Sequence, residues 1–452
     1  MISTTAHSRL RLLFGSLLAL AALAGPSRAD LMEYVQKEDP TYQYEIRKEL
    51  DFPQARGFLV HMISQNWRGL TWSHWILLVS PKKQRHENAA TLILSGGRNG
   101  PAPRISSERT FYITALAERL GCPFAMLFQI PNQPILGDRS EDELIAYTFD
   151  KFLKTGETDW PLLLPMTKSV IRAMDCIQEI LLQKTERKIT RFCVTGGSKR
   201  GWTTWLTAAC DPRVVAIAPL AIDTLNMSRQ LSHQLDAWGS FSKQIADYTQ
   251  IDLPGRMKKD PRGQALLQLV DPYTYRERVQ IPKMIFVGTN DRYWPLDSAS
   301  LYFRDLKGPS FLHYVPNAGH SLSQAVIPHV CSFFDRVLNL RPLPQIQTSF
   351  ALDERSATVT TVSSVQPLRV ELWQAYSDTR DFRDSRWTSR PVTPSAAGAF
   401  VAHLPRPRKP GTHLAFYLQL HLREGSGTLG FSSPVKLLPA PAQPDSSSQS
   451  PR

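Results

Sequence analysis

Ser198 is the residue that most clearly indicates catalytic chemistry, and it lies within the block Gly196-Gly-Ser-Lys-Arg-Gly201. An apolar run precedes this block and a helical pattern follows it. A tight turn from strand to helix holds its apex hydroxyl out over the sheet edge, with the helix N-terminus beside any developing oxyanion. Compared with the G-x-S-x-G pattern, Arg200 replaces the second glycine. The block predicts Ser198 as a nucleophile, and the alternative is a serine that caps the helix.

A serine nucleophile needs a base and an acid, and α/β-hydrolases supply them in the chain order Ser, Asp or Glu, His. Asp291 follows the predicted strand 283–287, and His320 follows the predicted strand 310–314. These positions predict His320 as the base and Asp291 as the acid that orients it. Asp223 is the alternative acid, and chain order favours Asp291 over it.

Further site residues are predicted around a glycine-rich loop, 95–100, that follows an early apolar run. Backbone amides stabilise an oxyanion, and the predicted donors are those of Gly96, Gly97 and Lys199. The side chains predicted to line the substrate pocket are Arg98, Asn99 and Trp294. The Lys199 side chain has two interpretations, a solvated lysine or a cation that attracts an anionic substrate.

This chemistry requires no cofactor, and the sequence predicts none. The chain lacks the G-x-x-x-x-G-K-[ST] phosphate loop and the dinucleotide fingerprint. Its five cysteines have no metal-type spacing. An odd number of cysteines leaves at least one thiol unpaired, even where a disulfide can form.

Alternating strand and helix patterns are predicted to position these residues. Buried strands separated by helices indicate a mostly parallel sheet with helices on both faces, as in α/β-hydrolases. The expected strands are 75–80, 89–94, 124–130, 189–195, 214–220, 283–287 and 310–314. The expected helices are 106–120, 162–184, 199–209 and 321–338.

Two regions depart from this alternation and divide the chain. Residues 226–270 are polar and helical in pattern, which predicts a lid inserted above the sheet within a hydrolase domain of residues 30–344. Residues 345–438 contain short alternating runs, which predict a small β-domain of sandwich type. The Pro/Ser/Gln-rich residues 439–452 are expected to be a disordered tail.

The N-terminal residues 1–29 have the pattern of a secretory signal peptide, with basic residues, an apolar run and small residues before the expected cleavage site. The alternative is a retained anchor. No later stretch is long and apolar enough to span a membrane. We therefore expect an exported protein, either periplasmic or secreted.

The composition supports a folded and basic protein. The 452 residues include 42% hydrophobic types and carry a net charge of +13, or +10 without residues 1–29. Intrinsic disorder and fibrous classes are excluded. The charge is spread along the chain, which argues against nucleic acid binding and is compatible with an anionic envelope surface or an acidic substrate.

Several blocks together resemble the PhoPQ-activated pathogenicity-related protein family. They are residues 160–166, 196–205, 271–275, 281–284, 290–291, 316–320, 370–373 and 380–383. The resemblance implies an exported α/β-hydrolase-like domain with a C-terminal β-domain, in a family linked to bacterial virulence and to resistance against membrane-active peptides. It implies no particular substrate. The form of the serine turn also looks like that of glucuronoyl esterases.

The leading hypothesis is an exported serine hydrolase that cleaves an ester or amide in a small molecule, a peptide or a glycan ester. The alternative is a non-catalytic binding or signalling protein on the same scaffold, because a fold does not determine function.

Overall fold

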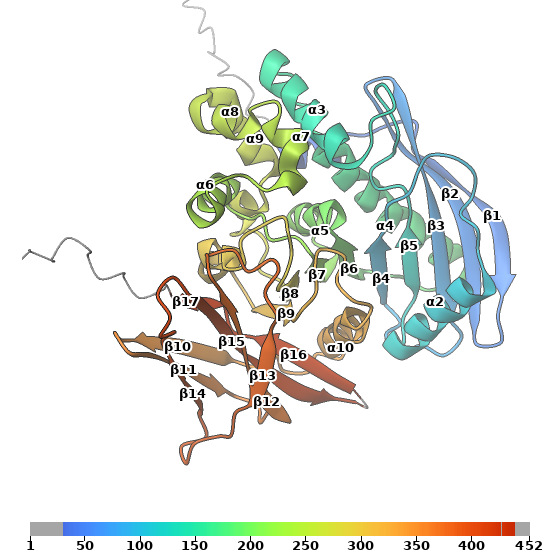
Figure 1. Ribbon diagram of the computed structural model, residues 1–452. Coiled ribbons are helices and arrows are strands. Elements are labelled where there is room, and N and C mark those ends of the chain that lie inside the picture. Colours follow the sequence, from blue (N-terminus) through green and yellow to red (C-terminus); the bar gives the residue numbers. More distant parts are fainter. Residues whose placement is uncertain (1–29, 426, 439–452) are drawn as a thin grey trace, which may run out of the picture.

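The computed structural model describes residues 30–425 and 427–438 (Figure 1). The predicted signal peptide and the predicted tail lie outside these residues. Within the described ranges, no helix combines the length and apolar character needed to cross a membrane. All five cysteines are described, and each is free and buried.

The central sheet has the strand order of an α/β-hydrolase, which confirms the predicted fold class. Its strands lie in the order β1-β2-β3-β5-β4-β6-β7-β8-β9. The strands from β5 to β9 are parallel, whereas β1, β2 and β3 pair antiparallel at one edge. The strand bounds are β1 (Gln43–Asp51), β2 (Ala55–Trp67), β3 (Leu70–Pro81), β4 (Ala89–Leu94), β5 (Phe124–Leu127), β6 (Arg191–Gly197), β7 (Val214–Leu220), β8 (Lys283–Gly288) and β9 (Ser310–Val315).

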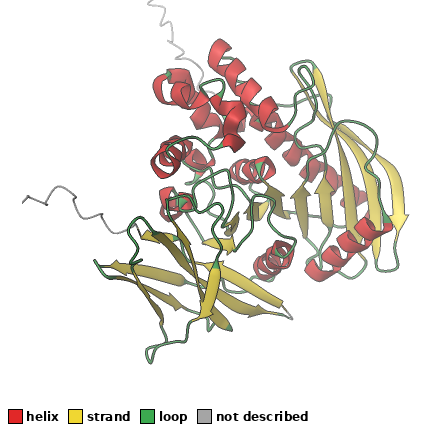
Figure 2. Ribbon diagram, viewed as in Figure 1, coloured by secondary structure: helices red, strands yellow, loops and turns green. Residues whose placement is uncertain are grey.

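Helices cover both faces of this sheet (Figure 2). Side chains alternate between the faces of a strand, so Ile76 and Leu78 of β3 pack in one apolar cluster while Leu77 and Val79 pack in the other. The first cluster contains residues of α1, α3, α4 and α5, and the second contains residues of α2 and α10. The bounds are α1 (Leu31–Gln36), α2 (Ser107–Leu120), α3 (Glu141–Thr155), α4 (Leu163–Thr185), α5 (Lys199–Cys210) and α10 (Val326–Leu338).

The predicted insertion, residues 226–270, is helical and lies between β7 and β8, as expected. It contains α6 (Met227–Trp238), η1 (Lys243–Ile245), α7 (Ala246–Thr249), α8 (Leu253–Lys259) and α9 (Pro261–Val270). The short helix η2 (Pro272–Tyr275) leads to β8, and η3 (Ser298–Leu301) and η4 (Phe303–Asp305) connect β8 to β9.

The C-terminal strands form two packed sheets, which confirms the sandwich-like fold predicted there. One sheet has the order β10-β11-β14, and the other contains β12, β13, β15, β16 and β17. An apolar cluster with residues from both sheets fills the space between them. The bounds are β10 (Ile346–Leu352), β11 (Ser356–Ser363), β12 (Arg369–Ser377), β13 (Thr388–Pro391), β14 (Phe400–Pro405), β15 (His413–Glu424), β16 (Gly427–Ser432) and β17 (Lys436–Leu438).

The second C-terminal sheet is continuous with the central sheet, which the sequence did not predict. β16 pairs with β9 through Ser432 and Leu312, and the Ser432 hydroxyl accepts a hydrogen bond from the Tyr314 amide at 3.0 Å. Two other differences concern helices. Helix α3 was not expected, and α10 begins at Val326 rather than near residue 321 because residues 316–325 form the loop that contains His320.

Candidate active site

Ser198 lies at the turn between β6 and α5, in a conformation that few non-glycine residues adopt. Its φ and ψ are 57° and −128°, and such backbone strain persists where the surrounding structure enforces it. The Ser198 amide donates to the Leu220 carbonyl at 2.8 Å, and its carbonyl accepts from the Trp202 amide at 3.0 Å. The neighbouring strand and the following helix therefore hold this turn on both sides.

Two glycines give the turn the room that it needs. A Cβ added at Gly196 would lie 2.8 Å from the Arg200 carbonyl oxygen. A Cβ at Gly201 would lie 2.7 Å from the Ile222 side chain and 2.9 Å from the Gly196 carbonyl oxygen. The steric requirement for glycine thus falls at position 201, which explains why the pattern departs from G-x-S-x-G at Arg200.

The structure brings Ser198, His320 and Asp291 into one hydrogen-bonded chain. His320 Nε2 lies 2.9 Å from Ser198 Oγ, and His320 Nδ1 lies 2.8 Å from Asp291 Oδ2. The other Asp291 oxygen accepts from the Tyr293 amide at 2.9 Å. The Asp291 side chain is only 8% exposed. This arrangement can transfer a proton from the serine hydroxyl to the imidazole while the carboxylate orients the ring.

Asp223, the alternative acid, makes a different contact. Its Oδ1 accepts a hydrogen bond from the Tyr302 hydroxyl at 2.5 Å. Burial raises the pKa of Asp223 to about 7. The carboxylate hydrogen-bonded to His320 is that of Asp291.

The predicted oxyanion donors lie at adjacent strand ends. Leu94 at the end of β4 is in register with Gly196 of β6, so the loop of Gly96 and Gly97 leaves the sheet beside Ser198. Gly97 has φ +128°, a value that favours glycine. Lys199 is the first residue of α5, so its amide has no acceptor within the helix.

Arg98 and Asn99 are not among the residues that line the cavity at Ser198. The Arg98 side chain is 69% exposed and lies 3.8 Å from Asp138. The Asn99 amide group donates to Asn132 Oδ1 at 3.1 Å, and its oxygen accepts from the Gln133 amide at 3.0 Å. Asn99 therefore joins two loops in this structure.

An apolar cavity of about 680 Å³, including its open mouth, begins at Ser198 and His320. Trp294 is among the residues that line it. Helices α3 and α5, the loop that follows β7, and the insertion supply most of its other walls. The apolar lining side chains include Phe149, Trp202, Ile222, Met227, Leu231, Ile245, Leu253 and Met257. We call this space the Ser198 cavity.

Charged residues of α3 hold the basic residues of the serine turn, which the sequence analysis missed. Lys199 Nζ lies 2.7 Å from Glu141 and 3.5 Å from Asp142, and its side chain is buried. Arg200 makes two hydrogen bonds to Glu141, at 2.8 and 2.6 Å. Neither interpretation of Lys199 anticipated this internal ion pair.

The Glu141 carboxylate is strongly stabilised in its charged form. Burial alone would raise its pKa, but hydrogen bonds and charge from Arg200 and Lys199 lower the pKa to about 2. In sequence, Glu141 and Asp142 look like ordinary acidic residues, and no helix was predicted at this position. The two consecutive cations, Lys199 and Arg200, were the feature of the sequence that could have indicated that carboxylates pair with this turn.

Tyr293 is a second site residue that the sequence did not indicate. Its ring stacks on the His320 ring with centroids 4.0 Å apart, and its hydroxyl donates to Asp142 at 3.3 Å. Asp142 also accepts from the Tyr248 hydroxyl of the insertion at 3.0 Å. Asp142 thus links the serine turn, the insertion and the residues next to Asp291.

Within the described residues, no three histidine, cysteine, aspartate or glutamate side chains are grouped as metal ligands. The site brings together the Ser198 hydroxyl, the His320 imidazole, the Asp291 carboxylate and an apolar cavity.

Comparison with solved structures gives esterases at low sequence identity. Acetyl xylan esterase 1 from Thermoanaerobacterium sp. JW/SL YS485 has a TM-score of 0.48 and 15% identity, covering 68% of this chain and 91% of that chain. A glucuronoyl esterase from Solibacter usitatus has a TM-score of 0.40 and 12% identity, covering 67% and 87%.

Sequence comparison extends over almost the whole chain. Autocrine proliferation repressor protein A from Dictyostelium discoideum is 29% identical over 466 residues, which cover 94% of this chain and 93% of that protein. The model of the PhoPQ-activated pathogenicity-related protein family matches residues 31–383, as the sequence motifs predicted. The chain therefore belongs to the PhoPQ-activated pathogenicity-related protein family.

Proposed function

We propose that this protein is a serine hydrolase that cleaves carboxylic esters with an apolar group next to the scissile bond. The observation that carries the proposal is the chain of hydrogen bonds from Ser198 through His320 to Asp291, at 2.9 and 2.8 Å. Its support is the strained backbone of Ser198, which is typical of a nucleophile held at a strand-to-helix turn.

The reaction follows from these positions in two steps. Ser198 Oγ attacks the ester carbonyl carbon while His320 Nε2 takes the hydroxyl proton, and the amides of Gly97 and Lys199 stabilise the oxyanion. The intermediate collapses, the bond to the alcohol breaks, and His320 protonates the departing oxygen. Water then attacks the acyl-enzyme with His320 as base, which releases the acid and restores Ser198.

The Ser198 cavity supports the choice of an apolar substrate group. Its lining is dominated by aliphatic and aromatic side chains, and such surface gains free energy when an apolar group displaces water. The insertion supplies much of this lining, so it acts in the proposal as the lid that selects the substrate. An anionic envelope surface as the place of action, export through residues 1–29 and a role in virulence remain predictions.

The direct test uses the chain from Asp30 onward with a fluorophosphonate probe. Ser198 Oγ displaces fluoride from phosphorus in this reaction, and peptide mass spectrometry locates the adduct. We expect labelling at Ser198 that is lost in Ser198→Ala and His320→Ala. Hydrolysis of p-nitrophenyl esters of increasing acyl length then measures the preference for apolar groups. A folded protein that stays unlabelled and cleaves no ester contradicts the proposal.

The second candidate is a non-catalytic binding or signalling protein on the same scaffold. The name of the 29% identical relative, an autocrine proliferation repressor, favours this candidate. A folded protein in which Ser198 does not react with the fluorophosphonate probe would support this candidate.

A further inference from the structure

The loops that contain Asp291 and His320 are bonded directly to one another. We call residues 289–295 the acid loop and residues 316–325 the histidine loop. The Asn290 amide donates to the Ala318 carbonyl at 2.9 Å, and the Asn317 amide donates to the Thr289 hydroxyl at 2.9 Å. A Cβ added at Gly288 would lie 2.4 Å from the Ala318 oxygen, so glycine permits this close approach. The two loops are therefore joined directly by hydrogen bonds and close backbone packing.

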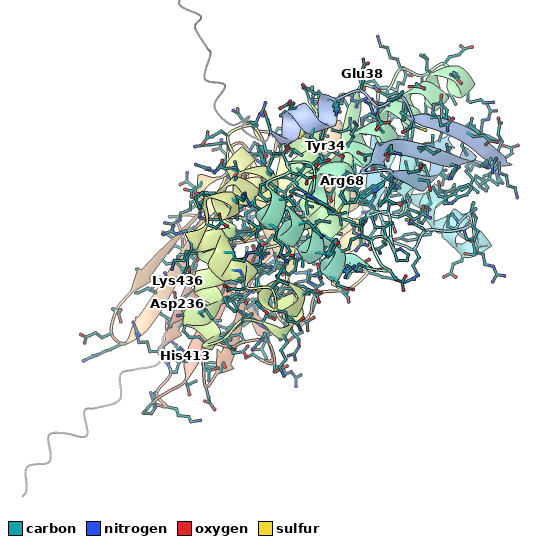
Figure 3. All side chains as sticks on the ribbon, turned by 90° about the horizontal axis from the view of Figure 1, so that it is seen from above. Tyr34, Glu38, Arg68, Asp236, His413 and Lys436 are labelled. Carbon is teal, nitrogen blue, oxygen red and sulfur yellow. The ribbon has the colours of Figure 1, made fainter. Side chains whose placement is uncertain are left out.

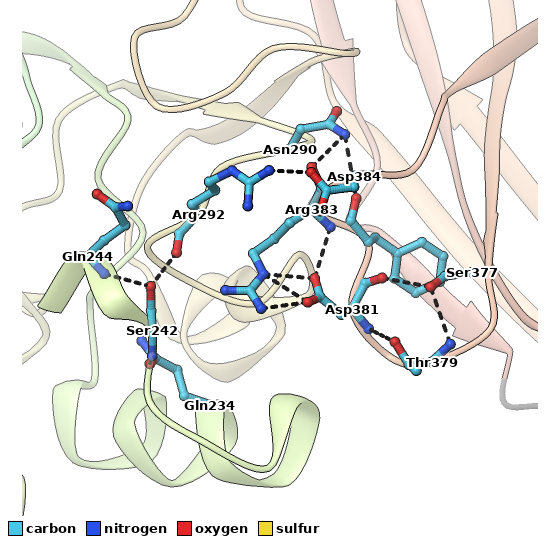
Figure 4. Close-up of polar contacts among 11 residues, drawn as sticks. Gln234, Ser242, Gln244, Asn290, Arg292, Ser377, Thr379, Asp381, Arg383 and Asp384 are labelled. Carbon is cyan, nitrogen blue, oxygen red and sulfur yellow. Dashed lines mark hydrogen bonds and ion pairs between the residues drawn. The ribbon is translucent and has the colours of Figure 1, made fainter. Parts of the chain in front are cut away.

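Residues 378–387 of the C-terminal domain, which we call the β12–β13 loop, bind both of these loops. The Asn290 side-chain amide donates to three carbonyls of the β12–β13 loop, those of Phe382, Arg383 and Ser385, at 3.5, 3.1 and 2.8 Å. Figure 4 shows Asn290 beside Arg383 of this loop. In the histidine loop, Asn317 donates to the Trp387 carbonyl at 3.1 Å and accepts from the Trp387 amide at 2.8 Å.

The β12–β13 loop is itself tightly held. Arg383 Nε lies 2.8 Å from the Asp381 carboxylate, and the Ser377 hydroxyl donates to the Asp381 carbonyl at 2.6 Å (Figure 4). Phe382 and Trp387 are each 2% exposed. Because its own side chains anchor it, this loop can impose a position on the residues that it contacts.

The insertion holds the acid loop from another direction. The Gln234 side chain donates to the Tyr293 carbonyl at 2.8 Å, and the Ser242 hydroxyl donates to the Arg292 carbonyl at 2.6 Å. Figure 4 shows these residues on one side of Arg292 and the β12–β13 loop on the other.

The β12–β13 loop also contacts the insertion. The Arg383 guanidinium lies 4.0 Å from the centroid of the Trp238 ring, and Arg380 donates to the carbonyl of Asp236 at 3.3 Å. Asp236 lies on the side of the molecule that also carries His413 of the C-terminal domain (Figure 3). The family match ends within the β12–β13 loop, at residue 383, and residues 380–383 are among the blocks that resemble the family.

We propose that the β12–β13 loop is a positioning element of the active site, and that Asn290 and Asn317 are the positioning residues through which the C-terminal domain holds Asp291 and His320 against Ser198. This inference rests on the proposed function. A displacement of about 1 Å in a catalytic group can cost about 100-fold in rate, so hydrogen bonds that restrict these loops affect turnover more than substrate binding.

The test uses three variants of the full chain and one control. Asn317 has φ +57°, so Asn317→Gly removes the amide group without adding backbone strain. Asn317→Asp keeps the acceptor for the Trp387 amide and loses only the donor. Asn290→Asp keeps the side-chain shape but places an oxygen against three carbonyls. The control is Arg386→Ala on the same loop, whose side chain is exposed.

Fluorophosphonate labelling rates, kcat and KM on a p-nitrophenyl ester, and melting curves are measured for each protein. For Asn317→Gly and Asn290→Asp we expect labelling rates and kcat to fall at least about tenfold, with KM changed less than about twofold. Asn317→Asp should give a labelling rate and a kcat between those of the wild type and Asn317→Gly. If another variant fails to fold, Asn317→Asp still tests the inference. The Arg386→Ala variant should match the wild type.

A purely structural role gives a different result. Folded variants that melt at lower temperature but keep the wild-type kcat and labelling rate overturn the inference. If the wild type itself is neither labelled nor active, the proposed function fails, which is a separate outcome.

Discussion

The two halves of the candidate site are held in place by different means. On the nucleophile side, Gly196, Ser198 and Gly201 are within six residues of one another, and the close contacts at the two glycines come from the turn itself and from Leu220 and Ile222 beside it. On the acid and histidine side, Asn290 and Asn317 bond to residues 70 to 95 positions away. One half is built on a short stretch of sequence held by elements of the same domain, and the other depends on contacts with the C-terminal domain.

The largest expected effect tests which carboxylate orients His320 on the acid and histidine side of the site. Asp291→Asn should lower kcat about 10⁴-fold, because it removes the charge that orients and stabilises the His320 ring. Asp223→Asn should retain kcat within a few-fold, because Asp223 bonds to Tyr302. Steady-state kinetics on one ester compares them, and equal losses in both variants would contradict the assignment.

The next effect tests the local half with a matched pair of glycines. Gly201→Ala should destabilise the fold by about 1–3 kcal/mol, as expected for added volume in a packed site, and should abolish labelling of Ser198. Gly197→Ala has no atom within 4 Å of the added Cβ and should remain folded. Urea unfolding with probe labelling measures both, and a stable, reactive Gly201→Ala protein would show that the turn tolerates a side chain.

A smaller effect concerns the buried carboxyl group of Asp223 and the dependence of stability on pH. Its pKa is about 7 in the folded protein against 3.8 as the reference. The folded state therefore holds the proton more tightly, and the free energy of unfolding should fall as pH rises from about 4 to about 7. Asp223→Asn should lack this decrease. Unfolding curves across this pH range give the slope, and identical slopes in both proteins would refute the expectation.

The smallest effect concerns Glu141, which supports the nucleophile half from α3. Its pKa is about 2 in the folded protein against 4.5 as the reference, so its contribution is present above about pH 4.5 and is lost as pH falls toward 2. Glu141→Gln should lower stability at pH 7 and flatten this acid-side decline. Melting temperatures between pH 2 and 7 test it, with Glu143→Gln on the same helix as a control.

Much of the fold was predictable because its elements carry strong local patterns. The predicted strand 214–220 coincides with β7, since a strand buried in a parallel sheet reads as one apolar run. The edge region was not predictable in the same way. β1 is largely exposed and mixed in composition, and α3 begins with acidic residues that also occur in loops.

The sequence by itself determined Ser198 and His320 as candidates and favoured Asp291 over Asp223 as the acid between them, because chain order is a property of the sequence alone. Only the tertiary structure decided that Asp291 rather than Asp223 contacts His320, that Glu141 neutralises Lys199 and Arg200, and that Asn290 and Asn317 bond to the β12–β13 loop. Each of these contacts joins residues at least 29 positions apart. Their free energy depends on burial and hydrogen-bond geometry, and these exist only once the chain has folded.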